Sequence, residues 1–154
     1  MDNGLHAIDC DVHPTVPNVK ALLPYLDDFW RDTVQERGIE SLETVTYPPN
    51  APLTSRPEWR GKNGQAATEV AQLAQQVCDR WQAGIAICNC LYGAQAAYDA
   101  YLAAAFCKAI NDWIATEWLS KDSRLSASIV VPMQAPDLAV EEIERRAGDN
   151  RFVS

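Results

Sequence analysis

The sequence predicts an α/β fold in which parallel strands alternate with helices. Two short, almost continuously apolar runs, at about residues 84–91 and 127–132, have the pattern of strands buried on both faces. The segment 94–119 between them is rich in alanine and carries apolar side chains at helical spacing, which predicts a long helix. A helix between two buried strands indicates a parallel βαβ unit. The 154 residues contain no linker-like segment, so we expect one domain over residues 1–154.

The first strand is predicted at about residues 7–13, where the sequence reads AIDCDVHP. Because side chains alternate along a strand, Asp9, Asp11 and His13 lie on one face and the residues between them lie on the other. Pro14 has no N–H to donate and ends the strand. Asp11 and His13 therefore present a carboxylate and an imidazole together at the C-terminal end of this strand.

Two helices and a long loop are predicted between the first and second strands. The first helix covers about residues 21–38 and ends at Gly38. Residues 40–64 contain several prolines and no sustained periodicity, and a loop of this length usually has a functional or covering role. The second helix is predicted over residues 66–83, with Gly84 as its end.

A last helix and the start of a fourth strand follow the third strand. Pro136 opens this helix, Gly148 ends it, and the fourth strand begins at residue 151. Glu142 and Arg146 are predicted to form an exposed ion pair at i,i+4 spacing. The apolar side chains on the opposite side of the helix are predicted to face the core: Ala139, Ile143 and Ala147. Four aromatic residues at helical spacing are also predicted to pack in the core: Trp81, Phe106, Trp113 and Trp118.

The composition excludes several classes of partner. Hydrophobic content of 47% and charged content of 22% are ordinary for a globular protein. The net charge of −8 argues against binding to nucleic acids or to anionic membranes, because both require clustered positive charge. No apolar run approaches the ~18 residues of a membrane span, and the N-terminus lacks the features of a signal peptide. We therefore expect a cytoplasmic protein whose five cysteines are reduced and mostly buried.

The Asp11–His13 pair has two interpretations on the residues alone. A hard oxygen and an imidazole at one point suit a divalent metal, with Zn²⁺ as the first choice and Mn²⁺ or Fe²⁺ also compatible. The alternative is a polar pair at a strand end whose hydrogen bonds are satisfied within the protein. The spacing does not choose between the two.

Several motifs in a fixed order resemble those of the amidohydrolase 2 family of metal-dependent hydrolases and decarboxylases. They are DCDVHP at the first strand, AINDW at 109–113, W-L-x-x-D-x-R-L at 118–125, and the later elements VVPMQ and EIERRA. The resemblance extends from the first strand to residue 154. It implies a (β/α)8 barrel of the TIM type with a metal at its C-terminal mouth, and it implies that Asp11 and His13 are metal ligands.

The resemblance also sets an expectation about completeness. A barrel of this kind typically has ~250 residues, so the chain is expected to supply its N-terminal portion, about three and a half βα units. The later histidine and late aspartate that the family implies as further ligands have no counterpart here, so we expect this segment alone to be inactive. An open part of a barrel exposes strand edges and apolar surface, and we expect the chain to self-associate as a homo-oligomer or aggregate.

The expected function is that of a metal-dependent hydrolase acting on a small organic substrate through an activated water. The nearest alternative is nonoxidative decarboxylation of a small aromatic or enoic carboxylic acid, and a noncatalytic interaction module is the alternative from another class. Asn89, near the end of the second strand, and Arg56, in the long loop, are the candidate substrate-binding residues. A guanidinium such as that of Arg56 can bind a carboxylate through two hydrogen bonds. The sequence identifies no catalytic acid or base.

Overall fold

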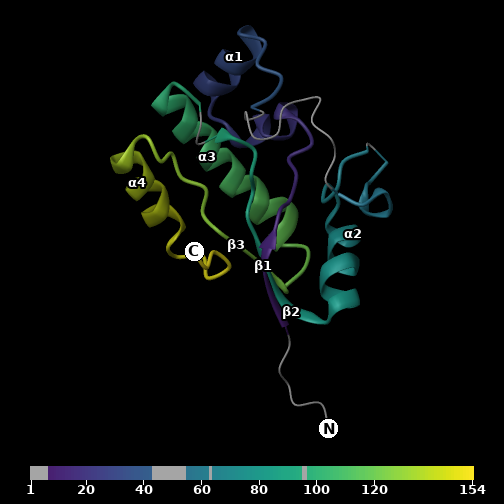
Figure 1. Ribbon diagram of the computed structural model, residues 1–154. Helices are drawn as coiled ribbons and strands as arrows, with labels where there is room; N and C mark the ends of the chain where they lie inside the picture. The colour runs from purple at the N-terminus through teal and green to yellow at the C-terminus, as the bar shows by residue number, and fades with distance from the viewer. Residues whose placement is uncertain (1–6, 43–54, 63, 95–96) are drawn as a thin grey trace.

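A three-stranded parallel sheet forms the centre of the protein (Figure 1). The computed structural model describes residues 7–42, 55–62, 64–94 and 97–154. The strands pair in the order β1-β2-β3, which is their order along the chain. Their bounds are Ala7–Val12 for β1, Ala83–Cys88 for β2 and Leu125–Ala127 for β3. The predicted α/β class with parallel strands is therefore confirmed.

The end of the chain returns beside β3 as a fourth parallel segment. Phe152 forms a parallel bridge with Ala127. The Ala127 N–H donates to the Arg151 carbonyl, and the Val153 N–H donates to the Ala127 carbonyl, both at 2.9 Å. Four segments thus lie side by side in chain order, as in part of a TIM barrel. A doubly wound sheet would instead reverse its order at β1, and the described strands show no such reversal.

Helices connect the strands and cover one face of the sheet (Figure 1). Short 3₁₀ turns precede α1, and π-helical turns extend α2 and α3. The bounds are η1 Val19–Ala21, η2 Leu23–Tyr25, α1 Asp28–Glu36, η3 Pro57–Trp59, α2 Val70–Ala74, η4 Gln75–Asp79, α3 Ala100–Ile114, η6 Ala115–Leu119 and α4 Pro136–Arg146. None of the described helices is long and apolar enough to span a membrane.

Capping residues fix both ends of α1 and the start of α3. Asp27 caps α1 by accepting the Trp30 N–H at 3.0 Å, and Gly38 follows the helix with a left-handed φ of +62°. Asp99 caps α3 by accepting the backbone N–H groups of Tyr101 and Leu102. The predicted end at Gly38 is confirmed, whereas the predicted start of the long helix at residue 94 is wrong, because the cap fixes the start at residue 100.

The junction between the second helix and β2 differs from the prediction. Gln82 has the left-handed φ of +55° that turns the chain, and Gly84 lies inside β2 instead of ending the helix. Ala83 already pairs with Ala7 in the sheet. Trp81, at the end of the helix, is 61% exposed, and the Arg80 guanidinium stacks 5.5 Å from its ring centre. The prediction that Trp81 packs in the core is therefore wrong.

The core lies between the sheet and the helices. Ala86, Cys88 and Ala127 of the sheet are fully buried, together with Phe106 and Ile110 of α3. The other core aromatics confirm the prediction: Trp113 and Trp118 are buried. Four of the five cysteines are buried and Cys10 is exposed, and all five are free. Burial raises the pKa of the Cys88, Cys90 and Cys107 thiols to about 12, so they stay protonated at neutral pH.

In the described part of the chain, the opposite face of the sheet is open. Because Ala86 and Cys88 point into the core, their neighbours Ile85, Ile87 and Asn89 point away from it. Ile85 is 41% exposed. The open face is the one that carries Asp11 and His13 from β1, so the polar side chains singled out in the sequence project from an accessible surface.

Helix α4 packs through polar side chains, which contradicts the predicted orientation. Glu142 is buried, whereas Ile143 is 46% exposed and Ala147 is exposed. The Glu142 carboxylate accepts a 2.7 Å hydrogen bond from the amide of Asn111, which is fully buried in α3. The rotation of α4 follows this buried hydrogen bond, since leaving either group unpaired would cost more than exposing an isoleucine.

Part of the predicted long loop is described. Residues 55–62 form an irregular segment that contains η3. Residues 43–54 and 63 of the predicted loop lie outside the described residues.

Candidate functional site

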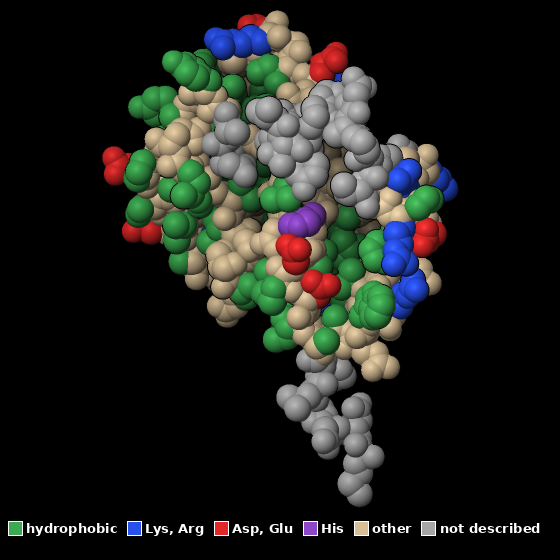
Figure 2. Space-filling view, in the orientation of Figure 1, with side chains coloured by type: hydrophobic (Ala, Val, Ile, Leu, Met, Phe, Trp, Pro, Cys, Tyr) green, Lys and Arg blue, Asp and Glu red, His purple; other side chains and the backbone are tan. Residues whose placement is uncertain are grey.

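Polar side chains follow four adjacent parallel segments at the same edge of the sheet. His13 follows β1, Asn89 follows β2, Ser128 follows β3, and Ser154 follows the bridge that pairs with β3. Figure 2 shows the histidine on the surface with acidic side chains beside it. The carboxyl ends of parallel strands are where α/β folds place their ligand sites. This edge is the candidate site.

Asp11 and His13 meet at this edge, as the alternation of the strand predicts. The His13 Nε2 lies 3.1 Å from the Asp11 Oδ1. The Asp11 side chain is 87% exposed and the His13 side chain is 41% exposed. Asp9 lies one strand repeat earlier, and its Oδ1 accepts the Asp11 N–H at 3.0 Å. The Asp9 carboxylate therefore holds the main chain at Asp11, while the side chains of Asp11 and His13 stay accessible to solvent.

The second nitrogen of His13 determines what the pair can bind. His13 Nδ1 lies 3.0 Å from the Asn89 main-chain carbonyl. A carbonyl only accepts, so Nδ1 carries a proton and donates it. In the neutral imidazole, the lone pair is then on Nε2 and faces the Asp11 carboxylate. Two acceptor atoms that face one another at 3.1 Å can share a proton or bind the same metal ion.

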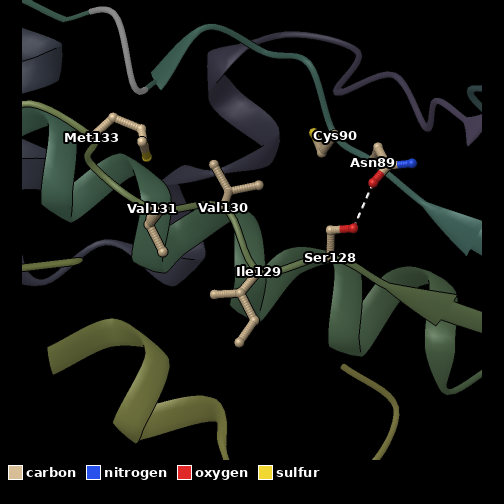
Figure 3. Close-up of a pocket in the computed structure, with 7 residues that line it drawn as sticks. All are labelled: Asn89, Cys90, Ser128, Ile129, Val130, Val131 and Met133. Carbon is tan, nitrogen blue, oxygen red and sulfur yellow. Dashed lines mark hydrogen bonds between the residues drawn. The ribbon is translucent and has the colours of Figure 1, made fainter. Parts of the chain in front are cut away.

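Asn89 links three strands through its side chain. Its Nδ2 donates to the Cys10 carbonyl at 2.9 Å and to the Ile87 carbonyl at 3.4 Å, and its Oδ1 accepts the Ser128 hydroxyl at 2.5 Å (Figure 3). The Ser128 Oγ lies 2.7 Å from the Ser154 Oγ. The amide thus connects the strand that carries Asp11 and His13 to the segments that follow β3.

Sequence reasoning missed Ser128 and Ser154. Ser128 lies within the apolar run 127–132, which was predicted to be one buried strand, but β3 ends at Ala127. The signal that would have identified it is its position directly after a parallel strand, next to the predicted site residue Asn89.

Arg56 lies apart from this cluster. Its guanidinium forms a 3.9 Å ion pair with Glu58 and stacks 5.6 Å from the ring centre of Trp59, both in its own segment. Within the described parts of the chain, it has no hydrogen bond or ion pair with Asp11, His13 or Asn89. The structure therefore brings together three of the four predicted site residues.

The described residues supply two candidate metal ligands at this edge. No group of three or more His, Cys, Asp or Glu side chains in the described ranges is arranged to hold a metal ion. The two donors that are present, the Asp11 carboxylate and the His13 imidazole, nevertheless have a separation that suits a shared metal ion. Two donor atoms bound to the same ion at about 2.0–2.2 Å lie roughly 3.0–3.5 Å apart, depending on the coordination angle. The 3.1 Å separation of Nε2 and Oδ1 falls within this range.

The sequential parallel strands with polar side chains at their carboxyl ends form an α/β arrangement that is consistent with part of a TIM barrel. The sequence model of the Amidohydro_2 family, described as amidohydrolase, matches residues 8–154. The chain belongs to this amidohydrolase family, as its motifs predicted. Members of the family are in general metal-dependent hydrolases or decarboxylases. No curated protein matches the chain.

Proposed function

We propose that the chain forms part of a metal-dependent hydrolase that acts on a small organic substrate, with Asp11 and His13 as two of the metal ligands. The observation that carries this proposal is the orientation of His13. Its Nδ1 donates to the Asn89 carbonyl, which leaves the Nε2 lone pair directed at the same point as the Asp11 carboxylate. Metal-binding histidines are oriented in this way by an acceptor on their second nitrogen.

The mixed oxygen and nitrogen donors favour Zn²⁺, with Mn²⁺ and Fe²⁺ as further possibilities. When bound, such an ion would lower the pKa of a coordinated water and polarise an oxygen of the substrate. Two protein donors leave several coordination positions for water, for substrate or for additional side chains. Asp9 supports the pair from the interior side because its carboxylate holds the Asp11 N–H.

Two residues are proposed to contact the substrate. Asn89 faces the same open edge as His13 and has a second Oδ1 lone pair beyond the one that Ser128 occupies. Arg56 is proposed to bind a carboxylate of the substrate, which would require its guanidinium to leave the weak ion pair with Glu58.

Metal titration of variants tests the proposed ligands. We expect the wild-type chain to bind Zn²⁺ or the spectroscopic probe Co²⁺ with one equivalent per chain. His13→Asn and Asp11→Asn each remove a donor, so the affinity should fall by at least the roughly 10–100-fold that the loss of a supporting partner causes. Asp32→Asn, an exposed position on α1, is the matched control and should bind as the wild type does.

Unchanged metal affinity in both ligand variants would contradict the metal site and favour a noncatalytic module. The reaction class is tested separately on an active form of the enzyme. Release of carbon dioxide from small aromatic or enoic acids would replace the hydrolase proposal by the decarboxylase alternative, whereas cleavage of an amide or ester without carbon dioxide would support it.

A further inference from the structure

The hydrogen bonds between Asn89, Ser128 and Ser154 run in one direction. Backbone carbonyls only accept, so the contacts of Asn89 with the Cys10 and Ile87 carbonyls fix its NH₂ group on that side. The Asn89 Oδ1 therefore faces Ser128, whose hydroxyl must donate to it across 2.5 Å. Ser128 has a single proton, so the Ser154 hydroxyl is the donor in their 2.7 Å contact.

This direction determines what the cluster offers to a ligand. In this arrangement, every proton of the Asn89 amide and of the two hydroxyls is already directed at a protein oxygen. The remaining capacity consists of lone pairs on the Asn89 Oδ1 and on the two serine oxygens. The cluster therefore accepts hydrogen bonds from a ligand and, as arranged, has none to donate.

A cavity of about 230 Å³ opens beside these groups. The described residues that line it are uncharged and, apart from Asn89 and Ser128, apolar. Figure 3 shows the side chains of Ser128 and Val130 pointing toward Asn89 and Cys90, whereas Ile129 and Val131 point the opposite way. Cys90 is buried, and its pKa of about 12 keeps the thiol neutral. The described residues of the lining include no cation that would compensate a bound anion.

The wall that carries Ser128 and Val130 is held rigidly. The Val130 N–H donates to the Asn111 Oδ1 at 2.9 Å, and the Val130 carbonyl accepts from the Asn111 Nδ2 at 2.8 Å. Asn111 is fully buried. A wall fixed in this way requires little reorganisation when a ligand binds, which favours selectivity for one kind of group.

We propose that this cavity, the Asn89–Ser128 subsite, binds an uncharged hydrogen-bond donor of the substrate, of which a hydroxyl group is the simplest, attached to a small apolar body. Its donor would contact the Asn89 Oδ1 and the Ser128 Oγ, and its apolar part would contact Val130 and Met133. A carboxylate would instead meet acceptors here and no positive charge. The assignment adds Ser128 as a specificity-determining residue.

The inference rests on the proposed function in one respect. The Asn89 main-chain carbonyl binds His13 while the Asn89 side chain lines the cavity. The subsite and the Asp11–His13 pair therefore meet at Asn89. Binding in the subsite itself needs no metal, so it can be measured with a chelator present, and its failure would leave the metal site untouched.

Ligand-observed NMR with three probes tests the subsite on the 154-residue chain. Benzyl alcohol carries a donor, benzyl methyl ether has the same apolar body without a donor, and benzoate is the anion. We expect benzyl alcohol to bind roughly 3- to 10-fold more tightly than the ether, the effect of one neutral hydrogen bond. Benzoate should not compete with benzyl alcohol. Equal binding of alcohol and ether, tighter binding of benzoate, or no binding of the alcohol would overturn the proposal.

Two variants test whether the preference for benzyl alcohol over the ether depends on Ser128. Ser128→Val removes one of the two acceptors, places a methyl group against the other, the Asn89 Oδ1, and suits an extended backbone, so the preference for the alcohol should fall. Ser126→Val makes the same change two residues earlier in β3 and should keep the wild-type preference. An equal loss in both variants would overturn the assignment to Ser128. If Ser128→Val does not fold, the comparison of probes on the wild type still decides.

Discussion

Asn111 forms both main-chain hydrogen bonds of Val130. Its Oδ1 accepts the Val130 N–H at 2.9 Å, and its Nδ2 donates to the Val130 carbonyl at 2.8 Å, as a neighbouring strand would. The same Nδ2 donates to the buried Glu142 carboxylate at 2.7 Å. One side chain of α3 therefore fixes both the segment after β3 and the packing of α4.

Asn111→Asp should unfold the protein at markedly lower denaturant concentration. An aspartate keeps the bond from the Val130 N–H, but it loses the two donated bonds and places a second buried carboxylate beside Glu142. We expect a loss of about 3 kcal/mol or more in the free energy of unfolding, measured by urea denaturation. Asn150→Asp, at an exposed position, is the control and should change stability by less than about 0.5 kcal/mol. A similar small change for Asn111→Asp would show that the buried network is not needed.

Gln82→Gly should stabilise the protein. Gln82 is exposed and holds a φ of +55°, a conformation that costs a residue with a Cβ roughly 1 kcal/mol and costs glycine little. We expect a gain of about 0.5–1 kcal/mol in thermal or urea unfolding. The same substitution at the exposed helical residue Gln75 should have the opposite sign, a loss of about 1 kcal/mol. Equal signs at the two positions would refute the backbone explanation.

Asp122→Asn should destabilise the protein at neutral pH but not in acid. The Asp122 carboxylate accepts hydrogen bonds from the Arg124 side chain and main chain, and these bonds lower the pKa of Asp122. A carboxyl whose pKa is lower in the folded state contributes stability above its unfolded pKa of about 3.9, and this contribution is lost as the pH falls through the folded value.

Urea titrations of wild type and Asp122→Asn between pH 7 and pH 2 measure this difference. We expect about 1 kcal/mol at pH 7, after allowance for screening of a partly exposed pair, and a difference that shrinks toward zero at the acid end. A difference that is constant with pH would mean that the Asp122 charge is not responsible.

The chain should self-associate in solution. β1 pairs only with β2 among the described strands, and apolar side chains are exposed on the strands, on α4 and near the end of the chain. They are Ile8, Ile85, Val140, Ile143 and Val153. Exposed edges and apolar surface favour pairing with another copy. Light scattering at micromolar concentration should detect species larger than a monomer.

A charge on the edge strand should reduce this association. Ile8→Lys places a cation on β1, a device by which edge strands avoid pairing. Phe29→Ser removes an exposed apolar residue from α1, away from the strand edge, and should leave the association unchanged. A monodisperse monomer with a cooperative melt for the wild type would contradict the prediction.

The features that depend on neighbours in the sequence could be predicted, and those that depend on distant partners could not. The two-residue spacing of Asp11 and His13 places them together because it is a local property of a strand, and the position of Asn89 follows from the parallel order. The burial of Glu142 was missed because helical amphipathicity counts apolar residues, whereas the partner of Glu142 is a buried amide 31 residues earlier.

The predicted boundary between the second helix and β2 was also wrong because it depends on a distant partner. Gly84 was expected to end the second helix because glycine readily adopts a left-handed conformation, but Gln82 adopts it instead. The pairing of Ala83 with Ala7 extends β2 backward past the glycine. Sheet pairing with a strand 76 residues away along the chain therefore overrode the local preference.

The main chain and the side chain of Asn89 have separate roles, so a substitution would affect only one of them. Its main-chain carbonyl orients His13, and a main-chain carbonyl is present whichever amino acid occupies the position. Its side chain joins β1 to Ser128 and borders the cavity. In the proposed subsite, a substitution of Asn89 would therefore change the group that borders the cavity while leaving a main-chain carbonyl to orient His13.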